Sequence, residues 1–182
     1  MLNRLISLFA GKQPNPAAVA LYRCIVEQAR QPDFYARHGV PDSLDGRFDM
    51  IVLHAFLVMR RLRAIGSETA NQLSQELFDL LFADMDNNLR EIGVGDLGVG
   101  KRVKKMAQAF YGRVEAYEAG LTATDDAILT DALTRNLYGT TQPALPNQLA
   151  MAAYMRAAEA HLAAQSEAGI LAGNVDFPAA PA

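Results

Sequence analysis

The chain has 182 residues and a formal net charge of −3, with 51% hydrophobic and 20% charged residues. This composition is typical of a globular protein, and the length suits one domain with a sizeable core. No apolar run approaches the roughly 18–20 residues that a membrane-spanning helix needs. A single cysteine, Cys24, excludes an internal disulfide and a cysteine-based zinc cluster, and it favours a reducing compartment.

Residues 1–12 combine basic and apolar side chains and contain no acidic residue. We expect a short helical segment that packs on the domain, with an amphipathic anchor on an anionic membrane surface as the alternative. The apolar stretch is short and has no small-x-small cleavage site, so we do not expect a secretory signal.

The spacing of apolar residues is helical almost throughout and predicts five or six main helices. They cover residues 17–30, 48–62, 69–89, 99–121 and 147–166, and a further helix begins after Thr124, which serves as its cap. The helix over 48–62 is apolar on nearly every side, as a central helix is. Residues 33–46 form an irregular connection. The prediction is therefore all-α: a single compact domain (13–170) between the short N-terminal segment and a disordered, flexible C-terminal tail (171–182).

The glycine-rich run from Gly93 to Gly100 matches G-x-G-x-x-G and, with Lys101, the start of a phosphate-binding loop. Both motifs need a preceding β-strand, whereas a long amphipathic helix precedes this run. Arg102 also stands where such a loop needs Ser or Thr. We therefore expect Gly93, Gly95 and Gly100 to shape a tight reversal between two helices.

No arrangement of residues predicts catalysis, a metal site or a cofactor site. The acidic residues Asp84, Asp86, Glu91 and Asp96 lack the register of a calcium loop. The three histidines lie far apart, and His54 falls in the most apolar helix, where a hydrogen-bonded core histidine is expected. Cys24 lies on an apolar helix face as a packed thiol. The chain is therefore not expected to be an enzyme.

Two basic runs remain, Arg60-Arg61-x-Arg63 and Lys101-Arg102-x-Lys104-Lys105. The second opens a helix, where the helix dipole disfavours positive charge, so it either binds an acidic partner or forms a solvated helix face. The chain is acidic overall, with 2 basic and 8 acidic residues over 115–182, which argues against DNA or another nucleic acid as the partner. Seven methionines supply either an adaptable apolar groove or core filler.

Several segments resemble the ubiquinol–cytochrome c chaperone family. The longest is Leu-Phe-Ala-Asp-Met-Asp-Asn-Asn-Leu-Arg-Glu-Ile-Gly-Val-Gly-Asp (81–96), followed by Val-Gly-Lys-Arg-Val-Lys-Lys-Met (99–106) and Phe-Tyr-Gly-Arg (110–113). The run Arg-Phe-Asp-Met-Ile-Val-Leu-His-Ala-Phe-Leu (47–57) fits the same pattern, as do Ala-Leu-Tyr and Ile-Val-Glu-Gln-Ala-Arg in the first long helix. The resemblance covers about residues 17–140.

This resemblance implies an all-helical assembly factor for respiratory complex III, the cytochrome bc1 complex, with newly made cytochrome b as its client. Mitochondrial members act with a partner assembly factor at the ribosome. The absence of a targeting presequence here implies a bacterial-type member, cytoplasmic or peripheral on the inner membrane.

For a client as apolar as cytochrome b, we expect an apolar groove flanked by a basic helix face. The expected partner-binding residues are Arg90, Lys101, Arg102, Lys104, Lys105 and Arg113, oriented by Asp86, Glu91 and Asp96. Two other classes stay open. One is a peripheral membrane or lipid-binding helical module. The other is an enzyme for an isoprenoid-like or quinone substrate, which would need a metal-binding motif such as Asp-x-x-Asp-Asp, absent from this sequence.

Overall fold

The computed structural model describes residues 14–139 and 141–181, so the expected N-terminal segment 1–12 lies outside the described residues. The described part is all-helical, which confirms the predicted fold class. Six helices have eight or more residues: α2 (Pro16–Ala29), α4 (Leu44–Ile65), α5 (Glu68–Glu91), α6 (Asp96–Thr122), α7 (Asp126–Leu133) and α8 (Leu145–Ala164). Three short pieces complete it: α3 (Pro32–Ala36), the π-helical turn η2 (Thr134–Tyr138) and α9 (Glu167–Leu171).

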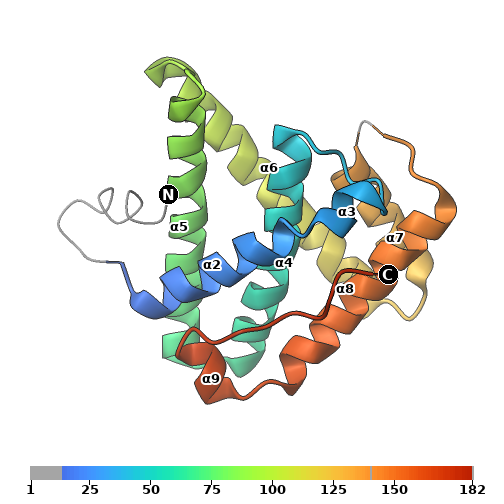
Figure 1. Ribbon diagram of the computed structural model, residues 1–182. Coiled ribbons are helices and arrows are strands. Elements are labelled where there is room, and N and C mark those ends of the chain that lie inside the picture. Colours follow the sequence, from blue (N-terminus) through green and yellow to red (C-terminus); the bar gives the residue numbers. More distant parts are fainter. Residues whose placement is uncertain (1–13, 140, 182) are drawn as a thin grey trace.

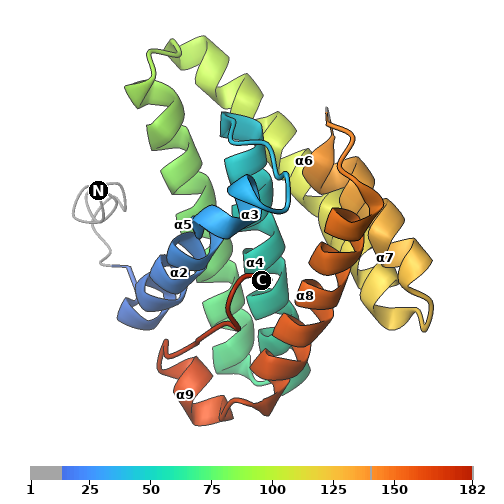
Figure 2. The same ribbon diagram turned by 45° about the vertical axis from the view of Figure 1, so that its right-hand side comes forward.

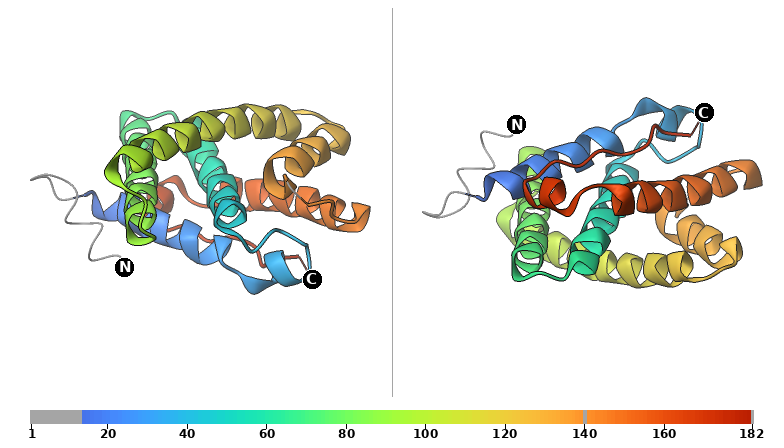
Figure 3. Two further views of the ribbon diagram at one scale, coloured as in Figure 1. Left: turned by 90° about the horizontal axis from the view of Figure 1, so that it is seen from above. Right: turned by 90° about the horizontal axis from the view of Figure 1, so that it is seen from below.

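The central helix is α4, as its apolar sequence predicts. It contacts α2, α5, α6, α8 and η2, and eight consecutive residues from Ile51 to Val58 are buried. Seen from above, α6 runs along one long edge of the molecule and α2 along the other, with α4 between them (Figure 3). A helix enclosed on several sides has no solvent face, and this explains why its sequence is apolar all round.

Side-chain caps mark the start of four of the six longer helices, α2, α4, α5 and α7. Ser43 accepts a hydrogen bond from the Gly46 N–H at the start of α4, and Ser67 accepts one from the Ala70 N–H at the start of α5. Between these two helices, Gly66 adopts φ 70°, a left-handed conformation that ends α4. The cap of α7 is Asp125 rather than the expected Thr124, because the Asp125 carboxylate accepts from the Ala127 N–H.

Helices α5 and α6 form a long hairpin whose turn lies at the opposite end of the molecule from α9 (Figures 1 and 2). The turn is shorter than the expected loop over 93–100, because α6 already begins at Asp96. Only Gly93, with φ 87°, needs glycine for its backbone conformation here. Gly95 precedes the helix as its cap and Gly100 lies within α6, so Gly100 does not shape the loop as predicted.

The prediction of a flexible C-terminal tail is wrong for the residues up to Pro181. Val175 is buried, and the Phe177 ring lies 5.1 Å from the His54 ring in an edge-on contact. Gln28 donates a hydrogen bond to the Pro178 carbonyl at 2.9 Å, and His38 Nε2 contacts the Pro181 carbonyl at the same distance. These contacts hold the segment along α2, although its proline-, alanine- and glycine-rich sequence suggests disorder.

Candidate functional site

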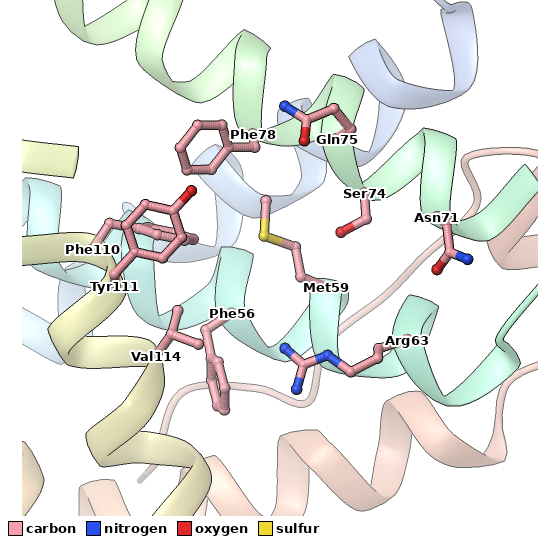
Figure 4. Close-up of a pocket in the computed structure, with 10 residues that line it drawn as sticks. All are labelled: Phe56, Met59, Arg63, Asn71, Ser74, Gln75, Phe78, Phe110, Tyr111 and Val114. Atoms are coloured by element: carbon pink, nitrogen blue, oxygen red, sulfur yellow. The ribbon is translucent and has the colours of Figure 1, made fainter. Parts of the chain in front are cut away.

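An open groove lies between α4, α5 and α6, with a volume of about 260 Å³. Its apolar lining comes from all three helices: Phe56 and Met59 from α4, Phe78 from α5, and Phe110, Tyr111 and Val114 from α6 (Figure 4). Polar side chains border it on the other side, namely Arg63, Asn71, Ser74 and Gln75. The groove is therefore apolar at its aromatic end and polar, without an acidic group, at its other end.

Three aromatic rings that line this groove, Phe78, Phe110 and Tyr111, form a cluster with Phe82 behind them, and we call these four rings the aromatic wall. The Phe78 ring centroid lies 4.6 Å from that of Phe82, 5.4 Å from that of Phe110 and 5.8 Å from that of Tyr111. Edge-on and tilted contacts of this kind fix the rings relative to one another. Tyr111 is nonetheless 61% exposed. A large aromatic side chain held in place at the surface is a candidate contact for an apolar partner.

Sequence reasoning missed the aromatic wall because its members come from two helices that meet only in the folded chain. The available signal was the i, i+4 spacing of Phe78 and Phe82 on α5 together with the adjacent Phe110-Tyr111 pair on α6. The methionines divide between both expected roles. Met59 is half-buried in this groove and Met106 in a second cavity, whereas Met50, Met85, Met151 and Met155 are buried core residues.

The four basic residues at the start of α6 lie on its solvent side. Lys101, Arg102, Lys104 and Lys105 are all exposed, and among the described residues none of them forms an ion pair. Leu97, Lys104 and Tyr111 recur every seven residues, so they lie along one face of α6. That face links the aromatic wall to the helix start, and it is the closest match to the expected apolar groove beside a basic helix face.

The other two predicted basic residues form ion pairs within the chain, Arg90 at the surface and Arg113 in the interior. Arg90 forms ion pairs with Asp86, at 2.6 Å, and with Asp96. These two acids therefore orient Arg90 and not the Lys101–Lys105 run. Arg113 points inward, where its guanidinium lies 2.7 Å from the Asp49 carboxylate and both side chains are largely buried. Arg113 thus ties α6 to α4 and is not on the surface that carries the other basic residues.

A second cavity, of about 340 Å³, lies on the other side of α6 and reaches this buried pair. Its lining includes Asp49, Arg113, Lys105 and Met106, with η2 closing one side. Burial raises the pKa of Asp49 to about 7, although the Arg113 guanidinium acts to lower it. The nearby Tyr117 hydroxyl is buried without a hydrogen-bond partner, and burial raises its pKa. The pair holds a charge-sensitive contact between two core helices.

The remaining candidate groups are structural. His54 contacts the Met50 carbonyl and the Tyr154 hydroxyl, each at 2.8 Å, and burial lowers its pKa to about 4. It is therefore the neutral, hydrogen-bonded core histidine that the sequence predicts. Cys24 is half-buried, and burial raises its pKa, which keeps the thiol protonated. Within the described residues, no group of three or more His, Cys, Asp and Glu side chains is placed to hold a metal ion.

Comparison with known proteins gives consistent results. Residues 36–177 match the family model described as ubiquinol-cytochrome C chaperone. The chain is 26% identical over 121 residues to "Ubiquinol-cytochrome-c reductase complex assembly factor 1" of Xenopus laevis, a match that spans 66% of this chain and 60% of the frog protein. It is 31% identical over 108 residues to "Protein CBP3, mitochondrial" of Saccharomyces cerevisiae, covering 58% of this chain and 32% of the yeast protein. The match thus spans three fifths or less of these two relatives.

A solved structure resembles the whole fold. The Cbp3 homolog from Brucella abortus superposes with a TM-score of 0.80 at 37% sequence identity, over 97% of this chain and 92% of that one. Separately, none of the helices in the described part of the chain combines the length and apolar character needed to cross a bilayer.

Proposed function

This chain belongs to the ubiquinol-cytochrome C chaperone family, and from that membership we propose that it is a non-enzymatic assembly chaperone for the cytochrome bc1 complex, respiratory complex III. Relatives that carry the name of a ubiquinol-cytochrome-c reductase complex assembly factor support the proposal. The client in this proposal is newly made cytochrome b, and the site of action is the cytoplasmic face of the inner membrane.

The observation that carries the client proposal is the apolar groove between α4, α5 and α6. A newly made membrane protein exposes apolar helices that aggregate in water unless another apolar surface covers them. The aromatic wall offers rigid contact area, and the half-buried Met59 beside it can adapt to different side chains. An amphipathic or apolar helix laid into a groove of this kind is a common mode of recognition.

The basic residues extend this surface toward the α5–α6 turn. Lys104 lies two helical turns from Tyr111 on the same face of α6, and Lys101 lies one turn further along. In the proposal, Lys101, Arg102, Lys104 and Lys105 contact acidic groups that flank the apolar segment of the client. Charge at the rim of an interface mainly raises the rate of association and selects the partner, while the apolar centre supplies most of the affinity.

Substitution at Tyr111 tests the groove without disturbing the core. In a strain that lacks the chromosomal gene, we expect a copy carrying Tyr111→Asp to lose most cytochrome b co-purification and most of the haem b signal of membranes, with cytochrome b transcript unchanged. Leu149→Asp on α8 is the matched control, because Leu149 is also an exposed apolar residue and lies outside the groove.

Both variants should remain folded, with urea midpoints close to that of the wild type, since both side chains are exposed. If Tyr111→Asp retains cytochrome b and complex III, the groove is not the client site. If complete deletion of the gene leaves complex III at wild-type levels, the assembly role itself is wrong.

A further inference from the structure

The turn of the α5–α6 hairpin presents apolar side chains that nothing in the described chain covers. We call residues 92–105 the hairpin tip. Within it, Leu97 is 90% exposed and Ile92 is 59% exposed, whereas Leu89 and Val99 just below are buried. Because Leu97 and Ile92 are largely exposed, they bury little apolar surface and contribute little to the stability of the hairpin. The tip is also the end of the molecule in Figures 1 and 2, where a flat surface can reach it without meeting another helix first.

The charge around these side chains is positive. Lys101, Arg102, Lys104 and Lys105 occupy the two turns that follow Leu97, starting about 6 Å along the helix axis at a rise of 1.5 Å per residue. Asp96, the acidic residue of the tip, forms its ion pair with Arg90. In the part of the chain that the structure describes, the four basic side chains have no carboxylate partner. Two exposed apolar residues beside a run of unpaired basic ones complement a surface with an apolar interior and anionic headgroups.

The glycines of the tip add a second, independent observation. Gly95 and Gly100 have negative φ angles, and a Cβ atom at either position would meet nothing within 4 Å. Gly95 is the N-cap of α6, a position where glycine is favoured over alanine. At Gly100, within α6, neither backbone conformation nor packing requires glycine, although glycine is less stable there than alanine. With no side chain at Gly95 or Gly100, Leu97 and Ile92 are the large exposed apolar side chains of the tip. Two exposed apolar side chains are too few for the centre of a stable protein interface, which buries about 800 Å² per partner.

We propose that the hairpin tip docks on a bilayer that contains anionic phospholipids, inserting Leu97 and Ile92 at the headgroup–acyl boundary while Lys101, Arg102, Lys104 and Lys105 contact headgroup phosphates. The docking uses the same four basic residues as the proposed client contact, but its apolar contacts, Leu97 and Ile92, lie outside the groove, so vesicle binding does not require the client. Docking would hold the hairpin tip at the membrane, and the groove between α4, α5 and α6 would then lie close to the bilayer.

Vesicle flotation with the full chain tests this proposal. We expect binding to phosphatidylcholine vesicles that contain about one third phosphatidylglycerol, weak binding to phosphatidylcholine alone, and release as salt is added. Leu97→Asp should lower the partition coefficient by at least about tenfold, and neutralising Lys101 and Arg102 together should reduce its dependence on salt. Leu149→Asp should bind as the wild type does, because Leu149, 48% exposed, lies on α8 and away from the tip.

A fluorescent reporter provides a measurement that does not depend on a loss of binding. Cys24 is the single cysteine of the sequence, so Cys24→Ser followed by Leu97→Cys allows one environment-sensitive dye at the tip. The dye should shift to the blue on anionic vesicles, and the same dye at position 149 should not.

Wild-type binding by Leu97→Asp, or an unshifted dye at position 97 on bound protein, would overturn the proposal. So would a deletion of residues 1–12 that abolishes binding while Leu97→Asp does not. Tyr111→Asp leaves the tip intact, so loss of cytochrome b and loss of vesicle binding remain separate results.

Discussion

Two basic runs that look alike in the sequence have opposite surroundings in the fold. In the α4 run, Arg60 pairs with Glu118 of α6 and with Glu159 of α8, and Arg63 pairs with Glu118 as well. Arg61 donates to the carbonyls of Leu162 and Gln165 at the end of α8. The α4 run therefore ties three helices together. The α6 run, Lys101 to Lys105, projects from the hairpin tip and makes no ion pair within residues 14–139 and 141–181.

The glycines of α6 differ in the same way: those packed against the body of the molecule, the part of the fold outside the α5–α6 hairpin, have close neighbours, and those nearer the hairpin tip do not. A Cβ atom at Gly120 would lie 2.8 Å from the Leu129 Cα, so α6 and α7 can pack this closely only with glycine. Gly100 and Gly112, earlier in the same helix, face open space. In the body, charge and glycine serve packing within the chain. Toward the tip, Gly100, Gly112 and the Lys101–Lys105 run do not, and residues that the fold does not need are the better candidates for binding something else.

Arg113 gives one of the largest expected effects. It belongs to α6, as the Lys101–Lys105 run does, yet it forms a buried ion pair with Asp49 of α4. Arg113→Met should lower the free energy of unfolding by about 1–3 kcal/mol, since it leaves the buried Asp49 carboxyl, whose raised pKa lets it take up a proton, without its hydrogen-bonding partner. Lys105→Met, in the same cavity lining but exposed, should change it by less than about 0.5 kcal/mol. Urea unfolding measures both values, and equal losses would mean that the Asp49–Arg113 pair contributes no more to stability than the exposed Lys105 does.

The pKa of Asp49 provides a second test of this buried pair. Burial raises its folded-state pKa to about 7, well above the value near 3.8 expected when the chain is unfolded. Between about pH 4 and pH 7 the unfolded chain therefore loses this proton while the folded chain keeps it. The contribution of Asp49 to stability falls as the pH rises through that window, by at most about 4 kcal/mol. The unfolding free energy of wild type minus that of Asp49→Asn should fall accordingly, and a flat difference would contradict the assignment.

The all-α class and the position of most helices could be predicted from the sequence, because the 3.6-residue apolar period and the Ser and Asp caps are local signals. His54 was predicted correctly for the same reason, since its neighbours along α4 are apolar. Arg113 was not, because its partner Asp49 lies 64 residues away and nothing local indicates their contact. The C-terminal segment was missed because a few contacts, from Val175, Phe177 and two backbone carbonyls, hold a sequence whose composition suggests disorder.

Alanine substitutions at two glycines of α6 should change the free energy of unfolding in opposite directions. Gly120→Ala should destabilise the protein by about 1–3 kcal/mol, because the new methyl group meets the backbone of Leu129. Gly112→Ala should stabilise it by about 0.5–1 kcal/mol, because alanine favours the helix and the added Cβ meets no atom. Thermal and urea unfolding give both signs. Stabilisation by Gly120→Ala would show that α6 and α7 are less closely packed than the structure indicates.

The smallest effect tests the opening comparison directly. Arg60→Gln keeps much of the side-chain stem but removes the charge shared by Glu118 and Glu159, and it should lower the free energy of unfolding by about 1 kcal/mol. Lys104→Gln should change it by less than about 0.5 kcal/mol. A double-mutant cycle with Glu118→Gln assigns the Arg60 loss to that pair if the two substitutions are not additive. Equal values for Arg60→Gln and Lys104→Gln would mean that the ion pairs of α4 contribute nothing measurable. The two basic runs would then differ only in what they can reach outside the chain, and binding measurements alone could tell them apart.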